Sequence, residues 1–136
     1  MRYRWLIVLC LVLLSACGAD NAPVERVKEF VAATEARDVD RMVAMIAPED
    51  RRDAGWQLRQ VMPRVEEIKL TEPQYTLDDG GDNDDSTARV QVSGLLVGKT
   101  NEGEPISAPS SQLIELVKVD GVWYITGNGL EPPPTP

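Results

Sequence analysis

Hydrophobic residues follow a helical period in the first half of the chain and a period of two in the second half. The first helix is predicted over 23–37, where Pro23 suits the first turn because its missing N–H would have no intrahelical partner there. The apolar stripe of this helix consists of Val24, Val27, Phe30 and Val31.

Two shorter helices are predicted next. Asp38 suits the N-cap position of the second helix, which ends before Pro48. The third helix starts at Pro48 and ends before Pro63, although Gly55 weakens it. The apolar positions of the two helices are Val39, Met42, Val43 and Ile46 in the second, and Ala54, Leu58, Val61 and Met62 in the third.

From Val65 onward, apolar and polar residues alternate, which predicts strands. The first strand is interrupted at Glu72 and Pro73 and resumes at Tyr75. Because a proline inside a strand belongs at an edge or a bulge, this is expected to be a bent edge strand. The second strand has one wet face, and Gly94 is expected to mark a bulge.

The remaining residues predict a loop, a third strand and a closing hairpin. The loop covers 100–110, and the strand over 111–119 is expected to be central and largely buried on both faces. Asp120 and Gly121 tolerate the positive φ angles of a type I′ turn, so they predict a hairpin to the last strand, 122–126. The sequence therefore predicts a single α+β domain.

The leader of the chain predicts export. Arg2 and Arg4 precede an apolar run over 5–14, which is about ten residues and too short to span a bilayer. Residues 14–17, Leu-Ser-Ala-Cys, resemble the bacterial lipoprotein box, which implies cleavage before Cys17 and lipid transfer to its thiol. The alternative is an ordinary signal peptide with a bystander cysteine. The predicted organisation is signal peptide 1–16, lipidated tether 17–22, domain 23–129 and a Pro-rich disordered tail 130–136.

Composition narrows the chemistry of the mature chain. Removal of Arg2 and Arg4 from the 14 basic residues leaves 12 against 22 acidic ones, a net charge of −10 that repels nucleic acid. There is no histidine, so neither a Ser-His-Asp triad nor a histidine metal site can form. Cys10 leaves with the leader and Cys17 is acylated, so no intramolecular disulfide is expected.

Three stretches together resemble the nuclear transport factor 2-like superfamily, also described as a cystatin-like cone. They are VKEFVAATEARDVDRMVAMI, ARVQVSGLLV and VDGVWYI. The resemblance implies a curled antiparallel four-stranded sheet around the N-terminal helices, with a pocket in the mouth of the cone and, in many members, a homodimer through the outer sheet face. Between Ile46 and Pro48 there is no room for the strand pair that isomerase and dehydratase members insert, so a shallow or absent pocket is expected.

Candidate site residues follow from this resemblance. Enzymes of the superfamily use a carboxylate or histidine base with a tyrosine or protonated acid as hydrogen-bond donor. The residues expected to line a ligand pocket here are Phe30, Tyr75, Glu115, Trp123 and Tyr124. Glu115 could act as a desolvated base, but an edge-facing charge is the commoner role of such a residue, and Trp123 is favoured as a core residue. No catalytic residue is assigned.

The acidic loop over 78–85 is the weak candidate for a metal site, with Asp82, Asp84 and Asp85 as ligands. The EF-hand spacing fails, because Thr87 stands where glycine is needed and Ser93 where a bidentate glutamate is needed. A solvated hairpin loop is therefore favoured, and no cofactor is expected.

The expected function is that of a lipid-anchored bacterial lipoprotein on the extracytoplasmic side of a membrane, the outer membrane if the organism has one. Its domain is expected to bind a small ligand or a protein partner without catalysis. The alternative is an isomerase or hydro-lyase of the same superfamily, and a third possibility is a scaffold with no specific ligand.

Overall fold

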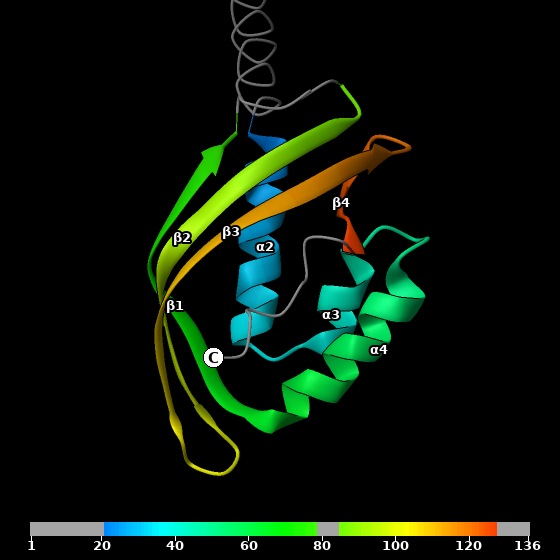
Figure 1. Ribbon diagram of the computed structural model, residues 1–136. Helices are drawn as coiled ribbons and strands as arrows, with labels where there is room; N and C mark the ends of the chain where they lie inside the picture. The colour runs from blue at the N-terminus through cyan, green and yellow to red at the C-terminus, as the bar shows by residue number, and fades with distance from the viewer. Residues whose placement is uncertain (1–20, 79–84, 128–136) are drawn as a thin grey trace, which may run out of the picture.

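The computed structural model describes residues 21–78 and 85–127, which form helices packed on one curled antiparallel sheet (Figure 1). The order of the strands in the sheet is β1-β2-β3-β4, so the predicted α+β fold with four strands is confirmed. The elements are α2 (Ala22–Glu35), α3 (Val39–Ala44), α4 (Arg51–Val61), the 3-10 helix η1 (Met62–Arg64), β1 (Val65–Leu77), β2 (Thr87–Thr100), β3 (Pro105–Val119) and β4 (Val122–Ile125).

The residues at the boundaries of the helices determine where each helix begins and ends. α2 has a proline in its first turn, as predicted, and the chain leaves it through Arg37, whose φ of 54° cannot continue a helix. The carboxylate of Asp38 caps α3 by accepting a hydrogen bond from the backbone N–H of Arg41 at 3.1 Å. The third helix begins at Arg51 and not at Pro48, because 47–50 forms a turn in which the N–H of Asp50 donates to the carbonyl of Ala47.

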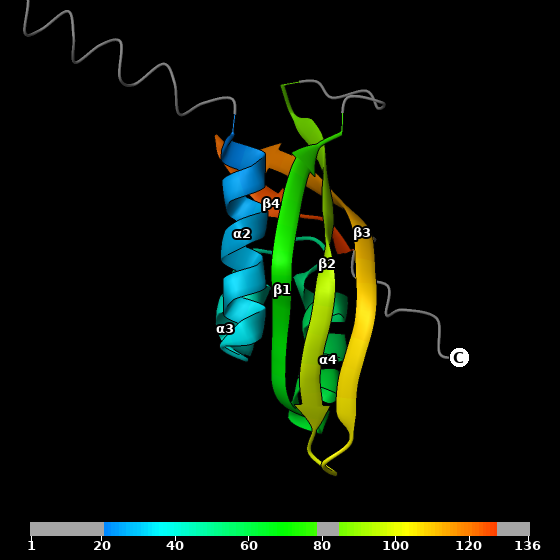
Figure 2. The same cartoon turned by 90° about the vertical axis from the view of Figure 1, so that its left-hand side faces the viewer.

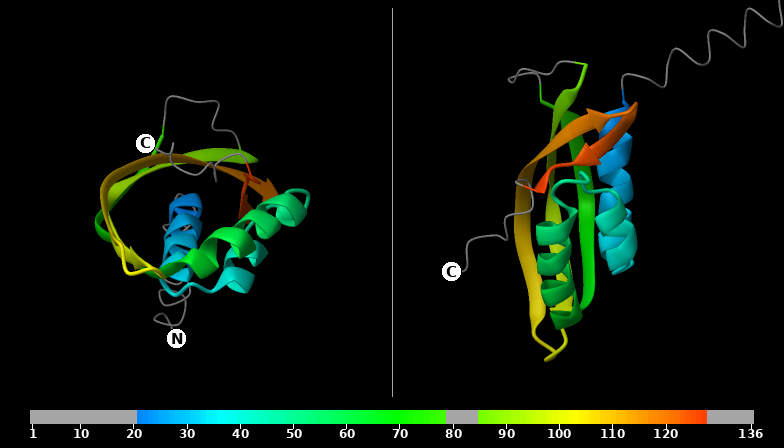
Figure 3. Two further views of the ribbon diagram at one scale, coloured as in Figure 1. Left: turned by 60° about the horizontal axis from the view of Figure 1, so that its bottom comes forward. Right: turned by 90° about the vertical axis from the view of Figure 1, so that its right-hand side faces the viewer.

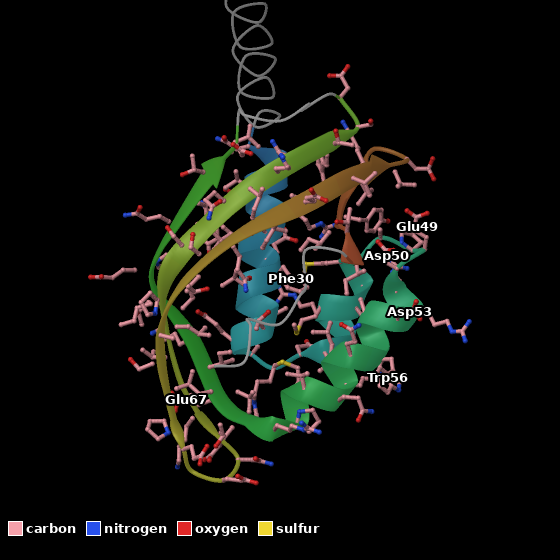
Figure 4. All side chains as sticks on the ribbon, in the orientation of Figure 1. Phe30, Glu49, Asp50, Asp53, Trp56 and Glu67 are labelled. Carbon is pink, nitrogen blue, oxygen red and sulfur yellow. The ribbon has the colours of Figure 1, made fainter. Side chains whose placement is uncertain are left out.

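Gly55 strengthens the packing of α3 and α4, although it weakens α4 as an isolated helix. A Cβ at this position would lie 3.3 Å from a methyl group of Val43 on α3. The absence of a side chain at Gly55 therefore lets the two helices approach closely. In Figure 4, Trp56 projects from the outward side of α4, where 66% of its surface is exposed.

A β-bulge bends β1 between Thr71 and Gln74, where three steps along β1 match two along β2. Glu72, with φ of 50°, takes up the extra residue, and Gly94 of β2 lies opposite the bulge. A Cβ on Gly94 would lie 2.8 Å from the carbonyl oxygen of Thr71, so glycine is required there. The predicted interruption of an edge strand is confirmed. Gly94 marks a bulge in the neighbouring strand, not in its own.

Strand β3 differs from the sequence-based expectation in two respects. It begins at Pro105, so most of the predicted loop over 100–110 is strand, paired in register with β2. The expectation that it is buried on both faces is wrong, because Ile114 is buried whereas Leu113 and Glu115 are exposed. A continuous partner in β2 outweighs the loop-like Pro and Ser composition of this segment.

The core lies between the helices and the concave face of the sheet, which curves around α2 (Figures 2 and 3). In the described segments, no polar or charged side chain is buried. Apolar side chains therefore fill the interior of the cone. The largest fully buried side chains are Met42, Ile46, Leu116, Ile125, Val27 and Val90.

The last strand fastens the helices to the sheet. The N–H of Ala47 donates to the carbonyl of Ile125 at 2.8 Å, and the N–H of Ile125 donates to the carbonyl of Met45 at 2.9 Å. These two bonds flank a parallel bridge between Ile46 and Ile125, both of which are fully buried. The segment after α3 is thus joined directly to β4.

The predicted leader, Cys17 and the predicted tail over 130–136 lie outside the described residues. Across 21–78 and 85–127, no helix has both the length and the apolar character that crossing a bilayer requires.

Candidate functional site

An open cleft of about 410 Å³ lies between α2 and the edge strand β1. Apolar side chains and charged side chains from both elements line it together with one tyrosine. These residues are Lys28, Val31, Ala32, Glu35, Lys69, Leu70, Thr71, Glu72, Pro73 and Tyr75. The volume falls within the range of small-molecule sites, and the cleft combines apolar walls with a few polar groups, as such sites do.

Helix α2 supplies one wall of the cleft. Lys28, Val31, Ala32 and Glu35 are spaced by three, four and seven residues, so they lie on one side of the helix. The carboxylate of Glu35 accepts a hydrogen bond from the backbone N–H of Leu70 at 3.0 Å. This bond satisfies an N–H of the edge strand and fixes the carboxylate beside β1.

Strand β1 supplies the other wall, and its bulge determines which way Tyr75 points. Without the extra residue at the bulge, Tyr75 would alternate onto the face opposite to that of Leu70. With it, Tyr75 pairs with Val92, packs partly buried against the core and lines the cleft. The ammonium of Lys28 lies 5.6 Å from the centre of the Tyr75 ring, within the range of a cation–π contact.

The phenol of Tyr75 is held in its protonated form. Burial, and secondly the negative charge of Glu35, raise the pKa of Tyr75 above 10.0. The cleft therefore contains a phenol that donates a hydrogen bond across the neutral range and a carboxylate that can accept a proton. These are the two kinds of group that proton transfer next to a carbonyl requires.

The other predicted pocket residues are not gathered in this cleft. Phe30 lies on α2 within the curve of the sheet and is 6% exposed, so it belongs to the core (Figure 4). Glu115 is exposed on the outer face of β3, where it lines a second cavity of about 360 Å³ that also includes Glu49. The structure thus separates Glu115 from Tyr75.

Trp123 and Tyr124 are both partly buried on β4, and cations face their rings. The ammonium of Lys118 lies 5.7 Å from the centre of the Trp123 ring. The guanidinium of Arg51 lies 5.5 Å from the Tyr124 ring and also donates to the carbonyls of Ile46 and Ala44. The contact of Arg51 joins β4 to α4, and the contact of Lys118 joins β4 to β3, so both have a structural role.

The acidic residues considered for metal binding give no site within the described segments. Asp82 and Asp84 lie outside those segments, and Asp85 is exposed. Among the residues that the structure describes, no three Cys, Asp or Glu side chains are grouped to hold a metal ion. Three acidic residues lie near the start of α4, namely Glu49, Asp50 and Asp53 (Figure 4). Asp50 has a structural role, because its carboxylate accepts a hydrogen bond from the backbone N–H of Gly127 at 2.9 Å.

Tyr75 is the one lining residue that was predicted for the pocket, and Glu35 and Lys28 of α2 are among those that the sequence-based prediction missed. They flank the apolar stripe of α2 and are seven residues apart, so a shared side of the helix could have been inferred. The packing of that side against β1 could not, because the bulge that places Tyr75 there depends on pairing with β2.

The chain has the nuclear transport factor 2-like fold, as the curled sheet around α2 indicates and as the resemblance predicted. No protein-family model matches the sequence, and neither does any curated protein. Solved structures with the same fold give the comparison instead.

Three of these structures illustrate the likeness. A protein of Novosphingobium aromaticivorans assigned as an aromatic ring hydroxylase superposes with a TM-score of 0.64 at 12% identity, over 77% of this chain and 84% of that chain. A ketosteroid isomerase-like protein of Erwinia carotovora atroseptica gives 0.61 at 13% identity, over 76% and 88% of the two chains. A protein of Streptomyces avermitilis assigned as a dehydratase of this family gives 0.60 at 16% identity, over 79% and 91%.

These comparisons overturn the expectation that the domain is not an enzyme. The three structures described above are assigned to hydroxylase, isomerase-like and dehydratase classes. The expectation had rested on the missing histidine and on the short segment between Ile46 and Pro48. Neither feature prevents a carboxylate and a tyrosine from lining one cleft, as Glu35 and Tyr75 do between α2 and β1.

Proposed function

We propose that the protein is a lipid-anchored extracytoplasmic enzyme of the isomerase or hydro-lyase class, which binds a small carbonyl compound in the cleft between α2 and β1. Glu35 acts as the base and Tyr75 as the hydrogen-bond donor to the carbonyl oxygen. The observation that carries this proposal is the convergence of one carboxylate and one phenol on a single cleft, with the bulge in β1 turning the phenol inward.

The proposed step is proton abstraction from the carbon next to the carbonyl. Glu35 takes the proton, the electron pair of the C–H bond forms the C=C bond of an enolate, and the negative charge moves to the oxygen that Tyr75 faces. In a β,γ-unsaturated ketone the enolate is conjugated with the second C=C bond, and return of the proton from Glu35 to the γ carbon gives the conjugated isomer. In a β-hydroxy ketone the enolate instead expels the hydroxyl group, which takes the proton from Glu35 and leaves as water.

The openness of the cleft limits what the free enzyme can do. Glu35 is exposed to water when the cleft is empty. A substrate with an apolar body would cover the carboxylate against the walls formed by Val31 and Leu70. We therefore expect the rate to increase with the size of the apolar part of the substrate.

Deuterium exchange tests the proposed step without knowledge of the natural substrate. The purified full chain is incubated with 4-oxopentanoate in D₂O, and loss of the proton signals next to the ketone is followed by NMR. We expect exchange faster than in buffer, and about a 10²-fold loss of that acceleration in Glu35→Gln and in Tyr75→Phe.

Matched variants decide whether the cleft is responsible. Glu115→Gln, on the outer face of the sheet, should retain the full rate. Equal rates in the Glu35→Gln variant and the unmodified chain would refute the assignment of the base. Folding of every variant is checked by circular dichroism.

The anchor is proposed separately, from residues 14–17 and the basic and apolar leader. Several acyl chains on Cys17 would hold the domain durably, because one chain gives only marginal membrane binding. Intact mass should show cleavage before Cys17 and the added lipid, and Cys17→Ala should release the protein from the membrane fraction. An unmodified thiol at Cys17 in the mature chain would contradict this proposal.

A further inference from the structure

Two lysines border the cleft from opposite sides. Lys28 projects from α2, where its ion pair with Glu25 is long, at 3.4 Å, and both side chains are about half exposed. Lys69 projects from β1 and, within the described residues, makes no ion pair. An exposed ion pair such as the one between Lys28 and Glu25 contributes little to the free energy of folding. An incoming anion can therefore replace Glu25 as the partner of Lys28.

Among the described residues, the two glutamates of the same cleft form no ion pair with its lysines. Glu35 instead accepts the N–H of Leu70. The lysines are therefore available to a ligand. Because two lysines and two glutamates line the cleft, its formal charge is zero in a molecule whose formal net charge is −8. The cleft thus repels an anion less than the acidic surface around it does.

We propose that the ligand of this cleft is a small carboxylate, and specifically an oxo acid, whose anionic group lies between Lys28 and Lys69 while its carbonyl faces Tyr75. This inference rests on the proposed function and adds the class of substrate to it. The apolar walls formed by Val31, Ala32 and Pro73 receive the hydrocarbon part of the molecule.

The expected strength of recognition follows from exposure. Each lysine is solvated, so each contact with the carboxylate adds a modest amount, about a threefold change in affinity for each lysine. High ionic strength should weaken binding, since exposed charges are screened. The two lysines act mainly on binding, whereas Glu35 and Tyr75 act on the chemical step.

A pair of probes of nearly equal shape tests the class of ligand. The full chain, labelled with ¹⁵N, is titrated with 4-oxopentanoate and with its neutral methyl ester, and the amide signals of Leu70, Thr71 and Tyr75 are followed. We expect shifts with the acid, about a threefold weaker affinity in Lys28→Gln and in Lys69→Gln, and little binding of the ester. Lys118→Gln, which lies at the β3–β4 end, is the control and should bind like the unmodified chain.

Equal binding of acid and ester, or unchanged affinity in both cleft-lysine variants, would overturn the proposal of an anionic ligand. If deuterium exchange still depended on Glu35 and Tyr75 in that case, the proposed function would stand without this substrate class. If the acid bound through the lysines but no exchange occurred, the anion site would stand and the proposed reaction would fail.

Discussion

Replacement of Glu35 should separate its structural role from its chemical one. Its carboxylate accepts a hydrogen bond from the backbone N–H of Leu70, a residue that is only 9% exposed. Leu70 belongs to β1, which lies at the edge of the four-stranded sheet. In Glu35→Ala that N–H loses its partner, which costs about 1–3 kcal/mol in general. Because the cleft is open and water can reach the N–H, the lower end of that range, about 1 kcal/mol, is expected here.

Glu35→Gln should cost less than half as much as Glu35→Ala. The amide oxygen of glutamine still accepts the N–H of Leu70, and only the additional strength of a charge-assisted bond is lost. Urea denaturation followed by tryptophan fluorescence measures both variants, and about 1 kcal/mol corresponds to roughly 4–8 °C in Tm for a domain of this size. Glu29→Ala is the control on the same helix; it removes an exposed ion pair with Arg26 and should change stability by less than about 0.5 kcal/mol.

Hydrogen exchange at one amide gives an independent measurement. The N–H of Leu70 should exchange faster in Glu35→Ala and nearly as slowly as in the unmodified chain in Glu35→Gln. The structural role assigned to Glu35 is refuted if alanine leaves both stability and protection unchanged, or if glutamine costs as much as alanine.

Three further results are expected. Gly94→Ala should cost about 1–3 kcal/mol in urea denaturation, because its Cβ would lie 2.8 Å from the backbone oxygen of Thr71; an unchanged midpoint would contradict this. The pKa of Tyr75 is raised above 10.0 by burial and secondly by Glu35, so the stability this group contributes is complete below pH 10.0 and is lost as pH rises through its folded-state pKa. Glu35→Gln should lower that pKa toward 10.0 in an NMR titration of the ring, and an unchanged or higher value would refute the attribution to Glu35. Ile125→Ala, at a fully buried position, should cost about 2–5 kcal/mol by calorimetry, and a cost below about 1 kcal/mol would show that the contact with the helices is dispensable.

Local patterns predicted the elements whose partners lie nearby in sequence. The alternation of Ala88, Val90 and Val92 gave a strand with one buried face, and all three are buried. Asp120 and Gly121 gave a hairpin, and both have positive φ, of 50° and 78°. In each case the residues themselves determine the backbone conformation.

The early part of β3 could not be predicted because its strand form depends on a distant partner. The N–H of Thr126 donates to the carbonyl of Glu115, so odd-numbered residues of β3 direct their backbone groups away from β2. Pro105 and Pro109 share this parity, and thus their missing N–H groups cost β2 no hydrogen bond. Proline in this segment indicated a loop, whereas in the sheet it protects an open edge.

The candidate site was predicted only in part for a similar reason. Tyr75 was identified from the sequence, but its partner Glu35 lies 40 residues away and meets it only when α2 packs on β1. Glu115, which the alternation placed on a mainly apolar strand, faces solvent because β3 is buried on one side only.

The bonds between Ile125 and the segment after α3 set the order in which the molecule can be completed. The helices are synthesised first, yet the residue that fastens them to the sheet belongs to β4, which follows all the other described elements in the chain. Contacts between such distant positions form slowly, because a long loop must close before they can contribute. A chain that ends before Ile125 would therefore keep the packing of α2 on β1 and β2 but lose the direct bonds between the segment after α3 and the sheet.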